Sequence, residues 1–250
     1  MSNNPVLSVV IPALNEADHL RSSLKSICEY FEARSIPTEI VVVDDGSTDD
    51  TVEVALKTTI TDLSLVKIRV LKNGANRGKG YSVRRGMLES QGLFSLMTDA
   101  DLSTPIEEFS KLEYFVMDGR FRVAIASRDL EGSRVEIHQS KVRENAGRLF
   151  NQLVRLFFPL KVRDTQCGFK LFSMQQCRKL FELQQLERFA FDVEILFIAH
   201  KLGLAIGEVP IIWRNAEASS LNFFKDGPRM LLDLMKIYWF DLTGKYSLKE

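Results

Sequence analysis

Short apolar runs alternate with polar loops and amphipathic segments through the first half of the chain. The runs have the length and the continuous apolar character of buried strands, and the segments between them have helical spacing, as Leu20, Leu24, Ile27 and Phe31 show. This alternation predicts a parallel sheet covered by helices, an α/β fold. The expected strands span 6–11, 39–43, 66–71, 93–97 and 123–126, and the later helices span 51–57, 81–90 and 104–118.

The pattern changes after residue 128. Residues 129–141 are polar, charged and aperiodic, which is typical of a long functional loop. No repeat or linker divides the chain, so we expect a single domain over residues 1–250. Helices are then expected over 143–158, 174–183 and 191–202, a polar turn over 164–170, and a late strand over 205–213.

Capping patterns predict where two of the helices begin. Residues 15–18 supply polar side chains in front of the first helix, and Thr104-Pro105-Ile106-Glu107 has the capping-box pattern with proline at the first helical position. We therefore expect the fourth helix to start at residue 104.

Composition and charge narrow the class of protein. With 250 residues and 45% hydrophobic content, the chain can bury a substantial core. Lys+Arg 33 against Asp+Glu 33 gives a formal net charge of +0, so no global field recruits nucleic acid or an anionic membrane, and recognition of any polyanion must be local. The 3 cysteines lack metal or disulfide spacing, and no stretch reaches the ~18 apolar residues of a membrane span. We expect a cytoplasmic protein that is soluble or peripheral on a membrane.

Two acids follow the fourth expected strand. Asp99 and Asp101 repel each other where that strand emerges at the sheet edge, and a divalent cation would remove the penalty. Mg²⁺ or Mn²⁺ takes one or two carboxylates plus substrate phosphates, so the pair predicts a diphosphate neighbour. A solvated turn that caps the next helix is the alternative.

Other polar residues gather at the same edge, because the carboxyl ends of parallel strands lie together. Asp44 and Asp45 suit a base N–H or a ribose hydroxyl, the alternative being a helix cap. In 73–80, glycines let backbone N–H groups approach an anion beside Lys79. This loop is not a P-loop, because its glycine spacing is one residue short and Gly80 replaces the Ser/Thr.

Taken together, the motifs resemble the inverting glycosyltransferases of family 2, which have the GT-A fold. The likeness covers about residues 6–244, and its later motifs look like those of the polyprenyl-phosphate sugar transferases, above all the dolichyl-phosphate β-glucosyltransferases. The motifs are VVIPALNE (9–16), VVDDGSTD (42–49), NRGKG (76–80), DAD (99–101), ASR (126–128), DTQCGFKLF (164–172) and ERFAFDVEIL (187–196).

The resemblance implies a Rossmann-like, mostly parallel sheet flanked by helices, with a nucleotide-sugar half (about 6–128) and a helical acceptor half (about 129–250). It also implies roles for individual residues. Donor binding falls to Pro12, Ala13, Asn15, Glu16, Asp44, Asp45, Lys79, Asp99, Ala100 and Asp101; Asp99 and Asp101 hold Mg²⁺ or Mn²⁺; and the catalytic set is Asp101, Arg128 and Asp164.

The implied reaction transfers glucose from UDP-glucose to a polyprenyl phosphate with inversion. That acceptor is already ionised at neutral pH, so fixed cations matter more than a strong base. Arg128, Lys141 and Arg143 are the candidates for its phosphate. Another UDP-sugar, GDP-mannose, a hydroxyl acceptor and a noncatalytic nucleotide-sugar-binding subunit stay open.

Some residues depart from the family pattern or allow two interpretations. Ser103 stands where related mannosyl-transferring enzymes often place a metal-binding Gln, and we expect no amino-terminal membrane helix of the eukaryotic kind. Asp192 and Glu194 form either a structural pair beside Arg188 or a base. The scattered histidines His19, His138 and His200 predict no metal role.

Two apolar elements suit a membrane surface. They are residues 149–158 and 230–240, the second inside a candidate interfacial helix over 226–242. For the first element, a core helix or an oligomer contact is the alternative.

Overall fold

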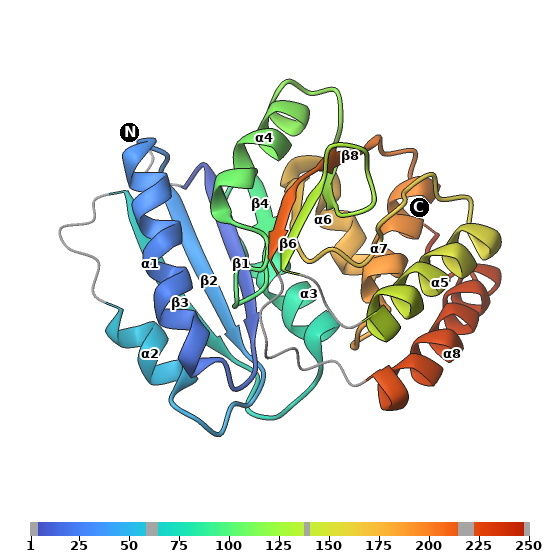
Figure 1. Cartoon of the computed structure of the whole chain (residues 1–250), viewed down its shortest axis with the longest axis horizontal. Helices are drawn as coiled ribbons and strands as arrows, with labels where there is room; N and C mark the ends of the chain where they lie inside the picture. Colours follow the sequence, from blue (N-terminus) through green and yellow to red (C-terminus); the bar gives the residue numbers. More distant parts are fainter. Residues whose placement is uncertain (1–4, 59–64, 138–140, 215–222, 248–250) are drawn as a thin grey trace.

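A seven-stranded, mostly parallel sheet forms the centre of the molecule (Figure 1). The computed structural model describes residues 5–58, 65–137, 141–214 and 223–247, with the backbone alone at 141–144 and 223–226. The strand order is β3-β2-β1-β4-β7-β5-β8, and only β7 runs antiparallel to its neighbours. The strands are β1 (Leu7–Ala13), β2 (Thr38–Asp44), β3 (Val66–Lys72), β4 (Phe94–Met97), β5 (Val123–Ser127), β7 (Lys170–Ser173) and β8 (Ile206–Pro210).

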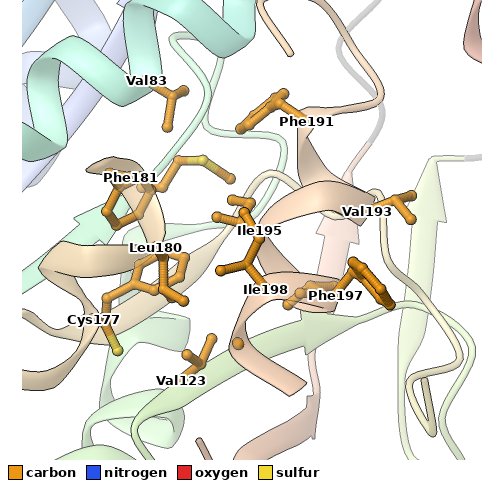
Figure 2. Packing of buried hydrophobic residues seen from close by; sticks show 14 of the residues in the cluster. Val83, Val123, Cys177, Leu180, Phe181, Phe191, Val193, Ile195, Phe197 and Ile198 are labelled. Carbon is orange, nitrogen blue, oxygen red and sulfur yellow. The ribbon is translucent and has the colours of Figure 1, made fainter. Parts of the chain in front are cut away.

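Helices cover both faces of this sheet, because successive strand residues point to opposite sides. In β1, Val10 enters one hydrophobic cluster while Val9 and Ile11 enter the other. Figure 2 shows the first cluster, where side chains of α6 and α7 meet Val83 and Val123. One face carries α3 (Lys79–Glu89), α5 (Lys141–Phe157), α6 (Met174–Leu183), α7 (Phe191–Lys201) and α8 (Phe223–Leu242); the other carries α1 (Ala17–Ala33), α2 (Thr51–Lys57) and α4 (Phe109–Met117).

The predicted α/β class, with a mostly parallel sheet flanked by helices, is confirmed, and three local expectations are wrong. The stretch 129–141 is not wholly irregular, because it contains β6 (Arg134–Ile137). The late strand is two strands in different sheets: β8 ends at Pro210, and β9 (Ile212–Arg214) pairs with β6. The sequence pattern also missed β7, which lies between the turn predicted over 164–170 and the helix predicted from residue 174.

The predicted capping box is the third wrong expectation. A 3-10 turn, η1 (Ile106–Glu108), precedes α4, and Thr104 makes no capping bond to it. The Thr104 hydroxyl instead lies 3.9 Å from the Cys167 sulfur. Tertiary packing therefore fixes this helix start.

Six of the seven strands run parallel to one another, so the loops after β1, β2, β3, β4 and β5 meet at one edge.

None of the helices in the described ranges has the length and apolar character needed to cross a membrane.

Candidate active site

The loops after β1 and β2 are joined by hydrogen bonds. Asn15 adopts φ 55° and donates its N–H to the Ser47 hydroxyl at 2.9 Å, while its side-chain oxygen accepts the Thr48 N–H at 2.8 Å. The Glu16 N–H is bonded to the Thr51 hydroxyl at 2.8 Å. These bonds fix the backbone that carries the candidate donor residues Pro12, Ala13, Asn15 and Glu16.

Asp44 and Asp45 are both buried, and they organise neighbouring loops. Asp44 accepts the Ser47 N–H at 3.0 Å. One oxygen of Asp45 accepts the Asn73 side-chain amide and the Arg77 N–H, and the other accepts the Gly78 N–H at 2.8 Å. Asp45 thus holds the glycine-containing loop in place.

Three acids and one lysine converge beyond β1 and β4. Lys79, the first residue of α3, forms an ion pair of 2.6 Å with Asp99. Asp101 accepts the Ser103 N–H at 2.9 Å. Burial and then the charges of Asp101 and Asp99 raise the pKa of Glu16 to about 7.

The two aspartates respond to this environment in opposite directions. Burial favours the neutral form of Asp99, but Lys79, Lys170 and Arg128 together outweigh it and the pKa of Asp99 is lowered. Burial, reinforced by the charge of Asp99, raises the pKa of Asp101. The site therefore holds an excess of negative charge that one lysine only partly neutralises.

Arg128 is fixed by a two-pronged ion pair. Its Nε and Nη2 lie 2.6 and 2.8 Å from the two carboxylate oxygens of buried Asp164, and its guanidinium stands 5.3 Å from the Trp213 ring centre. Although burial favours the neutral acid, Arg128 keeps the pKa of Asp164 below its ordinary range. The charge of Arg128 also lowers the pKa of Asp99, so the pair belongs to the same site.

A second buried pair, which the sequence did not indicate, lies beside the first. Lys170 is fully buried, forms an ion pair with Asp192 and donates to the Cys167 carbonyl at 2.8 Å. The structural alternative for Asp192 named Arg188 as its neighbour, whereas the ion-pair partner in the structure is Lys170. Burial raises the pKa of Asp192, although Lys170 acts against the shift. Lys170 also contributes to the positive field on Asp99.

Glu194 has a structural environment. It accepts the N–H groups of Gln185 and Leu186 and the Tyr246 hydroxyl, at 2.9, 2.8 and 2.7 Å. With its side chain fully buried, these bonds support the structural alternative for Glu194.

Gly168 touches Asp99 directly. A Cβ built on Gly168 would lie 2.2 Å from Oδ2 of Asp99, so a larger residue would displace that carboxylate. The turn 164–170 therefore forms a wall of the site. A glycine among polar residues in the DTQCGFK motif was the only sequence signal for this contact.

The remaining predicted residues have simpler positions. Ala13 ends β1, and Ala100 is buried between the two aspartates. Lys141 and Arg143 begin α5, but their side chains lie outside the described part of the chain, as does His138. Among the side chains that are described, no three His, Cys, Asp or Glu residues form a metal cluster.

Two relatives of known activity match nearly the whole chain. The chain is 39% identical over 256 residues to the dolichyl-phosphate beta-glucosyltransferase of Drosophila melanogaster, covering 97% of this chain and 77% of that protein. It is 34% identical over 257 residues to the enzyme of the same name from Dictyostelium discoideum, covering 99% and 78%.

A solved structure shares the fold. Glucosyl-3-phosphoglycerate synthase from Mycobacterium tuberculosis, crystallised in complex with Mn²⁺ and UDP-glucose, gives a TM-score of 0.67 at 20% identity, covering 98% of this chain and 80% of that one. The family description Glycosyl transferase family 2 matches residues 8–181. With the motifs, the fold and these relatives in agreement, the chain belongs to glycosyl transferase family 2.

Proposed function

We propose that this protein transfers glucose from UDP-glucose to a polyprenyl phosphate, with inversion and with a divalent metal ion. The observation that carries the proposal is the grouping of Asp99 and Asp101 with Lys79 and Arg128 at the carboxyl edge of the sheet. The names of the relatives support the acceptor and the sugar.

The two aspartates fit a hard divalent cation. They supply carboxylate oxygens in a site with excess negative charge, and Mg²⁺ or Mn²⁺ needs only one or two such ligands when a diphosphate supplies others. We assign Asp99 and Asp101 as the ligands. The bound ion would supply Lewis-acid stabilisation of the diphosphate leaving group. A fold relative crystallised with Mn²⁺ supports this assignment.

The donor half is assigned to residues 6–128. The uridine would lie against the bonded loops after β1 and β2, which carry Asp44 and Asp45, and Lys79 would neutralise diphosphate charge that the metal leaves. Because the protein's own bonds fix these loops, little ordering would accompany donor binding.

The acceptor half is assigned to residues 129–250, with Arg128 at the boundary. Asp164 uses Nε and Nη2 of Arg128, so Nη1 is the donor that we assign to the acceptor phosphate. Lys141 and Arg143 are the proposed helpers. A phosphate arrives ionised, so the chain's task is to hold the nucleophile in line with the sugar carbon.

We place this lipid-directed enzyme in the cytoplasm, peripheral at the inner face of a membrane.

The test is a donor screen against one short-chain prenyl phosphate, with Mn²⁺, Mg²⁺ or EDTA, read by product mass. We expect one hexose to be added from UDP-glucose with either metal and none with EDTA. Transfer from GDP-mannose or another UDP-sugar alone would change the donor. UDP-glucose binding without any transfer would make the chain a noncatalytic subunit.

Two variants distinguish a phosphate acceptor from a hydroxyl acceptor, which would need a base. Asp192→Asn leaves buried Lys170 without its counter-charge, so transfer is compared per folded molecule, with the folded fraction measured by circular dichroism. On that basis Asp192→Asn should cost less transfer than Arg128→Lys, which keeps the charge but loses the planar fork. The opposite order would favour a hydroxyl acceptor with Asp192 as its base.

A further inference from the structure

One side of helix α8 is apolar and exposed. Its inner side is buried, and Leu234 and Ile237 belong to the hydrophobic cluster that also contains α7. Its outer side repeats large apolar residues three or four positions apart, which places them on one face of a helix. We call this set the outer face of α8: Leu231, Leu232, Met235, Tyr238, Trp239 and Leu242.

The acidic side chains described in α8 are buried or paired with a lysine and do not belong to the outer face. In the described part of α8, Asp233 is nearly buried and paired with Lys236 at 2.7 Å, and Asp241 is paired with Lys201 of α7. The basic side chain of Arg229 is exposed near one end, and Lys245 lies 4.9 Å from the Phe240 ring centre near the other. Among the described side chains of α8, the exposed ones are apolar, aromatic or basic, and the partly exposed Asp241 is neutralised by Lys201, a combination that fits an anionic lipid surface.

Helix α5 extends the same side of the molecule, as Figure 1 shows. Its Val154 buries in the cluster that also holds Leu234, while Leu156 and Phe157 are exposed. Its residues 145–157 contain no acid.

The same helix lies near the candidate acceptor residue. In the turn that carries Asp164, the partner of Arg128, the Thr165 hydroxyl donates to the Asn151 side-chain oxygen of α5 at 2.9 Å. Helix α5 therefore adjoins the proposed acceptor phosphate site.

We propose that the outer face of α8, together with the exposed apolar residues of α5, docks this protein onto an anionic lipid bilayer. The proposal rests on the proposed function only in that a prenyl phosphate acceptor is a membrane lipid. A second copy of the chain fits this face less well. Two-fold pairing would set the face against itself and bring its basic ends toward like charges.

The chain provides its own reporter, because it has 2 tryptophans. Trp239 is 63% exposed on the outer face, whereas Trp213 is 8% exposed beside Arg128. We would add phosphatidylcholine vesicles, with or without phosphatidylglycerol, to the full chain and measure tryptophan emission and co-flotation. We expect a blue shift and flotation that are stronger with the anionic lipid and weaker at high salt.

Matched double variants identify the surface. Leu232→Glu/Leu242→Glu keeps Trp239 and should lower the bound fraction by about tenfold or more, because two apolar side chains no longer enter the bilayer. The control Leu56→Glu/Leu93→Glu changes two equally exposed leucines, 67% and 65%, on other elements and should bind as the parent does. Circular dichroism and thermal unfolding confirm that both variants are folded.

The proposal is overturned if the parent protein does not bind vesicles, or if the Leu232→Glu/Leu242→Glu variant binds them as well as the parent does. It is also overturned if the control variant loses as much binding as the Leu232→Glu/Leu242→Glu variant, or if sedimentation shows a parent dimer that the Leu232→Glu/Leu242→Glu variant makes monomeric. The last would assign the face to a second copy. No donor or prenyl phosphate is present, so none of these outcomes depends on glucosyl transfer.

Discussion

Gly168 sets the position of the Asp99 carboxylate. The methyl group of Gly168→Ala would lie only 2.2 Å from Oδ2 of Asp99, so the carboxylate has to move, and we expect it to rotate out of its pairing with Lys79. A displacement of this size at a reacting centre costs up to about a hundredfold in rate. We expect such a loss in transfer, with a weaker dependence on Mn²⁺ concentration and little change in thermal stability.

The matched control for this prediction is Gly147→Ala in α5. A Cβ at Gly147 meets nothing within 4 Å, so this variant should transfer as the parent does and be slightly more stable. If Gly168→Ala kept full activity and an unchanged metal requirement, Asp99 would not have the proposed role.

At the scale of elements, the Lys170 and Asp192 pair joins β7 to α7. Removing one partner leaves a buried charge without compensation, so Lys170→Met should lower the free energy of unfolding by about 3–5 kcal/mol. Lys170→Met/Asp192→Leu should recover much of that loss, as measured by denaturant unfolding. The exposed pair Lys179 and Glu182 is the control, and Lys179→Met should cost less than ~1 kcal/mol. A double variant no more stable than Lys170→Met would contradict the pairing.

The same element shows what the sequence could and could not predict. Strand β1 is a continuous apolar run buried on both faces, so its pattern is complete in the sequence. Strand β7 has four residues, begins with a lysine and gains its stability from pairing on both sides. Such nonlocal pairing leaves no periodic signal. Helix α4 was misjudged at its start for the same reason, because packing replaced the cap.

The site divides in the same way. Asp99, Asp101, Glu16 and Lys79 were predicted to meet because each follows a parallel strand or its loop, and the structure brings them together. The partner of Asp192 and the use of both Asp45 oxygens by loop donors depend on distances across the fold. Contacts such as these, an ion pair and hydrogen bonds between distant parts of the sequence, can be identified only from the folded structure.

Across the whole molecule, the acidic site should make stability depend on pH. The pKa of Glu16 is raised to about 7, so the folded protein keeps a proton that the unfolded chain loses at lower pH. The stabilisation is complete below the ordinary glutamate range and is lost as pH rises through about 7. Without metal, the free energy of unfolding of Glu16→Gln should fall by roughly 1–2 kcal/mol less than that of the parent as pH rises. This figure is small because solvent screens a half-buried group.

The measurement is the unfolding midpoint of the parent and Glu16→Gln between mildly acidic and neutral pH. Addition of Mn²⁺ with UDP should reduce the difference, because the cation stabilises the charged acids. Identical pH profiles for the two proteins without metal would show that neither burial nor the neighbouring aspartates raise the pKa of Glu16.

The central claim is that Asp99 and Asp101 bind a divalent ion that holds the diphosphate, and isothermal titration of UDP tests it most directly. We expect Mn²⁺ or Mg²⁺ to tighten UDP binding by about tenfold or more over EDTA. Asp101→Asn should abolish that gain, while Asp18→Asn, on an exposed acid of α1, should preserve it. UDP affinity that is the same with metal and with EDTA would contradict the account.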